Sequence, residues 1–444
     1  MKNLEFFLVN LSNFIWGEWL VYLLFFTGIY LTFSLKFIQL TKFHLSIKQL
    51  FKKNSLKDKN GNISSFQALA TAMGSCVGNG NIIGVATAIT AGGPGALFWM
   101  WIAGIFGMAT KYSEIVLGVH FRHKTPSNKY LGGPMYYISK GLNMKKLGFI
   151  YAFLLFFQNA GGTLIQSNAV KEVIVNLFYL NKFIASLLLI IATMFIVTGG
   201  IKRLGKISQF LVPFMTFFYI IGGILVIVYH KHILFDTLSL IFKSAFTPTA
   251  GAAGIAGYSI KSAMRYGIAR GLYSNEAGEG TAAVIHAAAM VNHPVKQGLL
   301  GFIEVGVDTI IICSITGLVI LTSGVSFLEI SPAIMVSIAF SKIHWSFKYI
   351  VGISMLLFGF SSIIAQWYFG NTTLNYLTNE KTGELYKYLF IMLVTLGPFL
   401  SLNLVWYIQD IFLGLLIIPN IFSLFMLSPL IKNLTFNFFK QRSI

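Results

Sequence analysis

Long uncharged stretches are the feature that most constrains what this chain can fold into. Several of them run for about twenty residues, the length of helix that crosses the hydrocarbon core of a bilayer. Of the 444 residues, 56% are hydrophobic and only 11% are charged, too few charges to cover a soluble protein of this size. We therefore expect an all-α, polytopic transmembrane helical bundle, because helices satisfy their own backbone hydrogen bonds in lipid.

The hydropathy pattern predicts eleven membrane spans without an intervening soluble domain, so that 1–444 forms a single transmembrane domain. The predicted spans are Phe14–Leu35, Phe66–Ala91, Gly95–His120, Gly148–Phe178, Phe183–Gly199, Ser208–Tyr229, Leu240–Ser262, Gly298–Thr322, Phe347–Leu377, Tyr386–Leu404 and Ile411–Leu430. Between the seventh and eighth spans, Ala263–Gln297 is expected to form short helices at the cytoplasmic membrane face.

Basic residues predict the orientation of the spans. The net charge of +19 could suggest a nucleic-acid partner, but Lys and Arg lie between the apolar stretches, mostly in alternate loops. The positive-inside rule places those loops in the cytoplasm. We expect a multi-pass protein of the inner (plasma) membrane, with the N-terminus outside, the C-terminus inside and no nucleic-acid partner. The first residues lack a small-residue cleavage site, so no cleaved signal peptide is expected.

The sequence contains no motif of an ATP-driven pump or a soluble enzyme. There is no Gly-x-x-x-x-Gly-Lys-Ser/Thr loop, and the eight histidines show no His-x-x-x-His spacing. Cys76 and Cys313 both fall inside apolar segments, where free buried thiols are expected. We therefore expect neither an enzymatic activity nor a resident cofactor.

The second predicted span is interrupted by Gly74–Asn81, which reads GSCVGNGN. Glycine lowers helix propensity by about 1 kcal/mol relative to alanine, so this run favours an unwound stretch within the membrane. Freed backbone amides there suit a carboxylate, and freed carbonyls suit a cation. Close helix packing through small residues is the alternative, but it does not require Asn79 or Asn81.

A second glycine-rich run, Gly251–Gly257, lies five spans later. Paired glycine-interrupted spans in two halves indicate the midplane binding site of a transporter. We expect 66–230 and 240–431 to form inverted repeats of five spans each, with 1–65 adding a first helix and a basic cytoplasmic loop. Two unrelated glycine-rich packing faces are the alternative.

Polar residues inside the predicted spans are further candidates. Asp308 is a functional candidate because an ionisable group is predicted in the middle of a span, or else it is one partner of a buried salt bridge. Glu304 is expected nearer the cytoplasmic face. Ser361 and Ser362 offer hydroxyl oxygens suited to sodium, or else bond back to their own helix. Lys111 is expected near a span end, as an ion pair or a snorkelling group.

Five stretches of this sequence resemble the alanine-or-glycine:cation symporter family, and the resemblance extends over nearly the whole chain. They are Gly78–Glu114, Gly132–Tyr137, Arg265–Gly278, His293–Val295 and Phe358–Ser362. The resemblance implies the leucine-transporter fold and sodium-coupled uptake of alanine or glycine, with proton coupling in some members.

The resemblance also implies roles for individual residues. Gly74 and Val77 would bind sodium through the backbone and Ser361 and Ser362 through hydroxyls; Gly78, Asn79 and Gly80 would hold the substrate carboxylate; Gln166 and Trp367 would line the substrate pocket; and Cys76 and Asn81 would belong to a second cation site.

Two residues depart from the pattern of this family. Asn79 stands where the family usually has threonine, and Glu279 stands where an apolar residue is expected. Both departures affect the choice of substrate rather than the fold.

These observations lead us to expect a secondary active transporter that carries a small neutral amino acid inward with sodium, by alternating access. A proton-coupled transporter of the same fold is the alternative, and a cation channel is a weaker one, because the sequence offers no repeated filter segment. A membrane-embedded enzyme would need a catalytic cluster in the spans. We expect the substrate carboxylate to be held without Lys or Arg, since Lys111, Lys171 and Lys261 lie near predicted span ends.

Overall fold

Long apolar helices form most of the molecule. The computed structural model describes residues 2–51, 61–247, 259–327, 330–400 and 402–441. Among these residues, 7 helical segments are long and apolar enough to cross a membrane, or 8 if a pair bent by 57° counts as one span. The 7 segments are Leu4–Ser34, Ala96–His120, Lys145–Phe178, Gly200–Tyr229, Pro294–Thr322, Trp345–Leu377 and Leu404–Met426, and the bent pair is Ser65–Cys76 with Asn79–Gly92.

The first half of the chain runs from the N-terminal helices to the long helix α11. Its elements are α1 (Lys2–Ile15), α2 (Glu18–Ser34), α3 (Ile38–Thr41), α4 (Phe43–Leu50), α5 (Ser65–Cys76), η1 (Asn79–Asn81), α6 (Ile83–Gly92), α7 (Ala96–His120), β1 (His123–Lys124), β2 (Tyr130–Leu131), α8 (Pro134–Gly141), α9 (Lys145–Phe178), α10 (Lys182–Val197) and α11 (Gly200–Tyr229).

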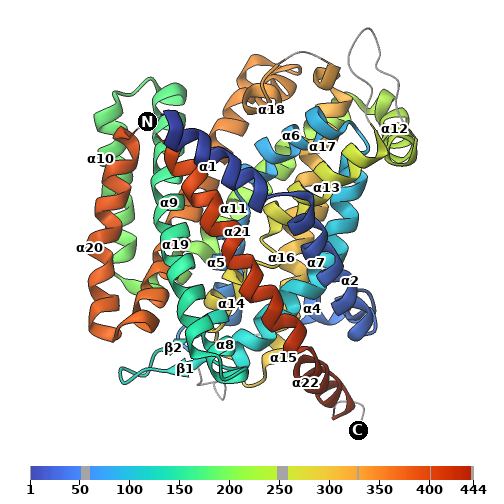
Figure 1. Cartoon of the computed structure of the whole chain (residues 1–444). Coiled ribbons are helices and arrows are strands. Elements are labelled where there is room, and N and C mark those ends of the chain that lie inside the picture. The colour runs from blue at the N-terminus through green and yellow to red at the C-terminus, as the bar shows by residue number, and fades with distance from the viewer. Residues whose placement is uncertain (1, 52–60, 248–258, 328–329, 401, 442–444) are drawn as a thin grey trace.

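The second half begins with a short helix and ends in α22, which lies at the edge of the molecule (Figure 1). Its elements are η2 (Lys231–Ile233), α12 (Leu234–Phe246), α13 (Ile260–Asn275), α14 (Thr281–His286), α15 (Pro294–Gly298), α16 (Leu300–Val305), η4 (Gly306–Cys313, a π-helix), α17 (Ser314–Thr322), η5 (Val325–Phe327), α18 (Pro332–Ser341), η6 (Trp345–Phe347), α19 (Lys348–Leu377), α20 (Glu380–Leu396), η7 (Gly397–Phe399), α21 (Asn403–Met426) and α22 (Ser428–Lys440).

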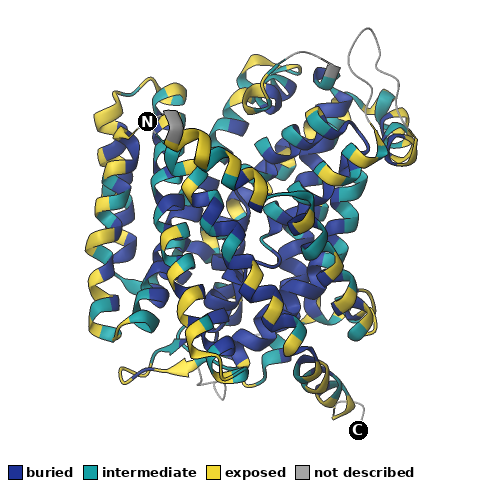
Figure 2. Ribbon diagram, in the orientation of Figure 1, coloured by how far each residue is buried: buried dark blue, intermediate teal, exposed yellow. Residues whose placement is uncertain are grey.

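Helices from the two halves pack against each other in the interior. α9 packs along α19, α13 along α7, and α21 along α9, while α5 lies between α11 and α19. Figure 2 shows that buried residues fill the centre and that exposed residues follow the outer helix faces. Many of those exposed residues are large and apolar, such as Phe210, Phe214 and Phe217 on α11. This is the surface of a lipid-facing protein, since lipid replaces water around the helices.

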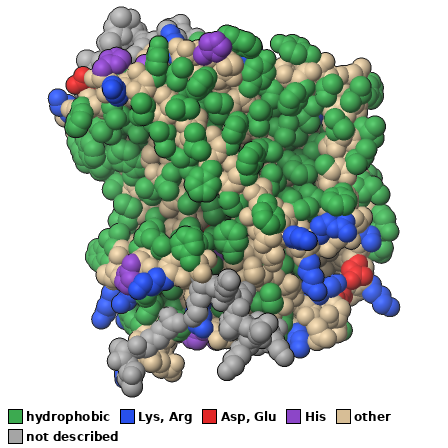
Figure 3. Space-filling model, turned by 180° about the vertical axis from the view of Figure 1, so that it is seen from behind, with side chains coloured by type: hydrophobic (Ala, Val, Ile, Leu, Met, Phe, Trp, Pro, Cys, Tyr) green, Lys and Arg blue, Asp and Glu red, His purple; other side chains and the backbone are tan. Residues whose placement is uncertain are grey.

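Charged side chains on the surface lie mainly at the two ends of the molecule and leave an apolar band between them. Figure 3 shows this band on one face, with Lys and Arg side chains gathered mainly at the end that also carries the β1–β2 hairpin in Figure 1. The distribution agrees with the predicted membrane protein and with the side that the basic loops share.

The structure corrects the predicted seventh span, Leu240–Ser262. α12 ends at Phe246 and a new helix, α13, begins at Ile260, while residues 248–258 are outside the described part of the chain. The glycine-rich run Gly251–Gly257 therefore also lies outside the described residues.

The prediction that Ala263–Gln297 lies on the cytoplasmic surface is wrong. α13 packs between α6 and α7, and every residue of α14 is buried. The error has a physical reason: α13 carries Arg, Ser, Asn and Gly residues that depress its hydropathy, but in its second half, from Gly267 to Asn275, neighbouring helices cover most of them.

Candidate functional site

The predicted break in the second span is present. α5 begins with a capping box between Ser64 and Gln67 and ends at Cys76, and α6 continues from Ile83 with a bend of 57° between the two axes. Between them, the side chain of Asn81 accepts a hydrogen bond from the Gly78 amide at 2.8 Å. This bond occupies one backbone amide of the break.

A second break, which the sequence analysis missed, separates α13 from α14. Glu276, Gly278 and Gly280 take left-handed backbone conformations, with φ of 55°, 104° and 84°. The φ of 104° at Gly278 is one that residues with a side chain rarely adopt, and a Cβ there would also displace the Leu24 side chain, so this position favours glycine. The two glycines Gly278 and Gly280 could have indicated this break in the sequence, but the charged residues around them are typical of a surface loop.

The two breaks lie side by side at the centre of the molecule. α13 contacts both η1 and α6, and α14 contacts α5. The unwound segments of two helices thus meet far from either end of the bundle. This arrangement brings backbone groups and polar side chains from both halves of the chain to one place.

The first group of predicted sodium ligands is brought together between α5 and α19. The Ser362 hydroxyl has three carbonyl oxygens within hydrogen-bond distance as acceptors for its single proton: those of Gly74 and Ser75, both at 3.3 Å, and that of Phe358 at 3.1 Å. The Ser361 hydroxyl donates to the Phe358 carbonyl at 2.8 Å. Both serines therefore bond back to their own helix, as the alternative anticipated, and Ser362 also reaches α5. Val77 is buried at the end of α5.

A second group of oxygen atoms surrounds Asp308 in the π-helix η4. Its carboxylate accepts hydrogen bonds from Asn81 Nδ2 at 2.7 Å, Ser274 Oγ at 3.0 Å and Thr309 Oγ1 at 2.8 Å. Asp308 is fully buried and forms no ion pair among the described residues. Cys76 and Asn81 were the predicted ligands of a second cation site, and the structure adds Asp308 and Ser274 beside Asn81.

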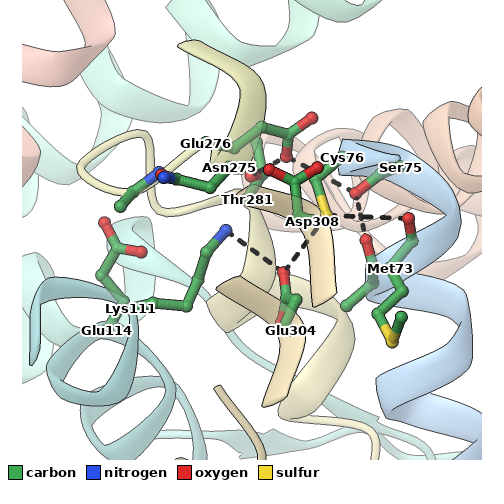
Figure 4. A network of polar contacts seen from close by, with 12 residues as sticks. Met73, Ser75, Cys76, Lys111, Glu114, Asn275, Glu276, Thr281, Glu304 and Asp308 are labelled. Atoms are coloured by element: carbon green, nitrogen blue, oxygen red, sulfur yellow. Dashed lines mark hydrogen bonds and ion pairs between the residues drawn. The ribbon is translucent and has the colours of Figure 1, made fainter. Parts of the chain in front are cut away.

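A buried ion pair joins the helices below the breaks. Lys111 Nζ lies 3.2 Å from Glu304 Oε1, and His286 Nε2 lies 3.1 Å from Glu304 Oε2. Figure 4 shows Lys111 reaching from α7 toward Glu304, with Glu276 and Asp308 above this ion pair in the view. Neither member of the pair is more than 1% exposed, so Lys111 forms the ion pair that is one of its two expected roles and does not snorkel to the surface. Sequence position along a helix does not reveal which residues other helices cover.

Glu114 and Glu276 hold the second break in place. The Glu114 carboxylate accepts hydrogen bonds from the Gly278 amide at 2.9 Å and from Asn420 Nδ2 at 2.7 Å. The Glu276 carboxylate accepts from Thr281 Oγ1 at 2.7 Å and Ser75 Oγ at 3.5 Å, the latter across the two breaks. These bonds give partners to polar groups that unwinding would leave unsatisfied.

A cavity of about 430 Å³ opens beside both breaks, a volume typical of small-molecule sites. Its polar lining includes several amides and four charged side chains. These residues are Asn79, Gln158, Gln166, Gln366, Gln409, Glu172, Arg270, Glu276 and Glu279, with Gly78 and Gly80 from the first break and Ser362 from α19.

The structure brings Gln166 to this cavity but not Trp367. Asn79 Nδ2 lies 3.5 Å from Gln166 Oε1, so these two predicted residues are neighbours. Trp367 instead lines a separate cavity of about 370 Å³ with Tyr368 and Asn371. Adjacent residues on a helix point about 100° apart, so Gln366 faces the central cavity and Trp367 faces away.

Basic and acidic residues of the cavity were also missed. Arg270 was expected in a cytoplasmic loop, yet it lines the cavity and lies over the Tyr273 ring at 5.9 Å. The expectation of a centre without basic residues is therefore wrong for Arg270 and for Lys111. Neither could be placed while α13 and its neighbours were assigned to the surface.

Comparisons with known proteins identify relatives along the whole chain. A sequence model of the sodium:alanine symporter family matches residues 1–444. The sodium/alanine symporter AgcS of Methanococcus maripaludis is 37% identical, with 96% of this chain and 96% of the relative covered. The probable sodium/glutamine symporter GlnT of Bacillus subtilis is 35% identical, with 98% and 91% covered. An uncharacterised transporter of Haemophilus influenzae is 38% identical, with 100% and 98% covered.

Solved structures share the arrangement of helices at low sequence identity. The crystal structure of MhsT in complex with L-phenylalanine has a TM-score of 0.58 at 16% identity, covering 85% of this chain and 99% of that chain. The crystal structure of a mutant of the Eremococcus coleocola manganese transporter has a TM-score of 0.57 at 13% identity, covering 84% and 83%. At these identities the likeness establishes the fold alone.

Proposed function

This chain belongs to the sodium:alanine symporter family, and we propose that it carries a small neutral amino acid, alanine or glycine, into the cell together with sodium. The family is one of membrane transporters rather than enzymes, and its fold is that of the leucine transporter. The observation that carries the proposal is the meeting of two broken helices beside one polar cavity. Broken helices at the interface of two repeats are where such transporters bind substrate and ion.

The second repeat of the proposed transporter begins at α13 rather than at residue 240. In this scheme α5–α6 corresponds to α13–α14, α7 to α15–α17, α9 to α19, α10 to α20 and α11 to α21. The first four of these pairs are in contact, which supports a two-fold relationship between the halves. α1 and α2 then form the additional first span, and the total remains eleven. The N-terminus is proposed to lie outside and the C-terminus in the cytoplasm, across the inner membrane.

Sodium is proposed to bind between α5 and α19. The carbonyls of Gly74 and Val77 and the hydroxyls of Ser361 and Ser362 are hard oxygen ligands at the unwound end of a helix. The substrate carboxylate is proposed to bind the Asn79 and Gly80 amides, next to Gly78, with Gln166 at its side. A second cation site would comprise the Cys76 carbonyl and the Asn81 side chain beside Asp308.

Proximity of the ion and the substrate accounts for coupling. Each stabilises the conformation that binds the other, and the effect is reciprocal by linkage. One sodium ion that crosses about 100 mV provides about 2.3 kcal/mol, or roughly 50-fold accumulation of a neutral substrate.

Proton coupling within the same fold is the second candidate. Several carboxylates face the centre, among them the buried Glu114 and Asp308 and the cavity-lining Glu276, and intramembrane carboxyl groups commonly serve as proton relays in transporters. A relative 34% identical to this chain carries the name putative sodium/proton-dependent alanine carrier protein.

Uptake into proteoliposomes tests the proposal. We expect labelled alanine or glycine to accumulate under an inward sodium gradient and not when choline replaces sodium. Protein-free liposomes are the control. Accumulation driven equally by a proton gradient without sodium would favour the second candidate, and no gradient-driven uptake of any amino acid would overturn both.

A further inference from the structure

Glu279, in the wall of the central cavity, is a buried residue whose carboxylate has no partner among the described residues. The residue is 6% exposed and lines the cavity. Its hydrogen bonds within the described part of the chain involve only the backbone: its N–H donates to the Glu276 carbonyl, and its carbonyl accepts from the Tyr151 hydroxyl at 2.6 Å. An ionised carboxylate is only an acceptor, so it is stable at such depth only if a donor or a cation reaches it.

The charged groups around Glu279 do not neutralise it. The charged groups close enough to interact electrostatically with Glu279 are the carboxylates of Glu276 and Glu114 and the ammonium of Lys111. Lys111 makes its ion pair with Glu304, at 3.2 Å. Arg270 lines the same cavity, but it lies over the Tyr273 ring and acts on Asp410. Carboxylates are therefore in excess around Glu279, which favours a positively charged ligand.

The rest of the cavity wall also offers acceptors. Asn79 Oδ1, Gln366 Oε1 and Gln409 Oε1 line the cavity and have no hydrogen-bond partner among the described residues. An amide can rotate to present either its oxygen or its nitrogen, whereas a carboxylate cannot. The amides can therefore adapt to a donor or an acceptor on the ligand, whereas Glu279 favours a positively charged group.

We propose that Glu279 binds a cationic group at the end of the substrate side chain, so that the transporter accepts short diamino acids besides alanine and glycine. The inference rests on the proposed function and concerns the part of the same site that would bind the side chain of the substrate. The substrate carboxylate would lie at the first break, and its side chain would point to the second break, where Glu279 stands. The apolar residue that the family resemblance leads us to expect at this position would favour an apolar side chain instead.

Two isosteric amino acids test the charge preference. L-2,4-diaminobutyrate and L-norvaline have the same number of non-hydrogen atoms and differ by an ammonium in place of a methyl group. After sodium-driven alanine uptake has been measured, each is used to compete with labelled alanine in proteoliposomes. We expect the wild-type protein to prefer diaminobutyrate by about tenfold or more, the contribution of one buried charge-assisted hydrogen bond.

Variants at Glu279 then separate charge from shape. Glu279→Leu is expected to reverse the preference toward norvaline, and Glu279→Gln to reduce it at least tenfold while sodium-driven alanine uptake persists. Glu384→Gln is the matched control, since it removes an exposed carboxylate outside this cavity, and the preference should be unchanged.

The other outcomes are also decisive. Equal competition by the two compounds in the wild-type protein would overturn the inference and leave the proposed function intact. A change in sodium or proton stoichiometry in Glu279→Gln, with an unchanged preference, would show that Glu279 holds an ion and would equally overturn it. No sodium-driven uptake of any amino acid would overturn the proposed function, and the inference with it.

Discussion

At the scale of single residues, the site depends on which atoms a short unwound segment exposes. Asn81 occupies the Gly78 amide with its own side chain and holds Asp308 with its nitrogen, so one residue fixes both the first break and η4. Ser362 reaches across from α19 to the end of α5. The residues of the site thus position one another, and single substitutions should separate ion binding from substrate binding.

Replacement of Ser361 and Ser362 tests the sodium assignment. We expect Ser361→Ala or Ser362→Ala to raise the sodium concentration for half-maximal uptake by about tenfold, equivalent to about 1.4 kcal/mol, because a hydroxyl ligand is lost. Sodium titration of alanine uptake measures this. Ser354→Ala removes another buried hydroxyl from the same helix and should have no such effect. Unchanged sodium dependence in the Ser361→Ala, Ser362→Ala double variant would remove the assignment.

Substitution of Gly80 tests whether the substrate carboxylate binds at the first break. A Cβ at Gly80 would meet Ser274 Cα at 3.6 Å and Tyr273 Cδ1 at 3.8 Å, both ordinary contacts. Gly80→Ala should therefore retain transport, whereas Gly80→Val should abolish substrate binding, because its extra methyl groups fill the space between the two breaks. Binding is measured by ligand-induced thermal stabilisation in the presence of sodium. Full alanine transport by Gly80→Val would place the carboxylate elsewhere.

At the scale of elements, α7, α14 and α16 are joined by an ion pair and hydrogen bonds as well as by apolar packing. Lys111 on α7 pairs with Glu304 on α16, and His286 at the end of α14 binds the same carboxylate. Gln297 Nε2 then lies 2.7 Å from His286 Nδ1. Since α14 follows the second break, this network holds one side of that break against α7.

Removal of Lys111 should be costly because it leaves the Glu304 carboxylate buried. We expect Lys111→Met to destabilise the protein by about 3–5 kcal/mol, and the double variant Lys111→Met, Glu304→Gln to recover part of the loss. Thermal unfolding in detergent measures both variants. Additive losses in the double variant would show that the two residues do not act as a pair.

At the scale of the whole molecule, the position of α13 determines the topology of the second half. If α13 and α14 together cross the membrane, the start of α13 lies on the same side as the start of α2. The ion pair between Lys261 and Glu18, at 3.1 Å, supports this placement. The predicted span Leu240–Ser262 would instead have placed Lys261 at the cytoplasmic face.

Accessibility of introduced cysteines distinguishes these topologies. Both native cysteines are buried, so background labelling should be low. We expect a membrane-impermeant thiol reagent to label Lys261→Cys and Lys231→Cys in intact cells, and Lys124→Cys only after permeabilisation. Labelling of Lys261→Cys only in permeabilised cells would restore the predicted cytoplasmic position.

The class of the protein, most of the helical segments and the first break follow from local features of the sequence. Twenty uncharged residues in a row can cross lipid only as a helix, and glycine and asparagine in the middle of such a run disrupt it whatever surrounds them. These are local properties, so hydropathy and propensity were sufficient to locate α7, α9, α10, α19 and α5–η1–α6 to within a few residues. The same stretches carried the family resemblance that the comparisons confirmed.

Which polar residues belong to the centre depends on the tertiary packing. Glu279 and Lys111 are buried, and Arg270 lines the cavity, because helices distant in sequence surround them, and hydropathy along one helix contains no information about its neighbours. For the same reason α13 resembled a surface helix, and the second break was sought at Gly251–Gly257. Gln366 and Trp367 differ by a single step along α19, and only the packing of that helix against α9 determines which of them faces the cavity.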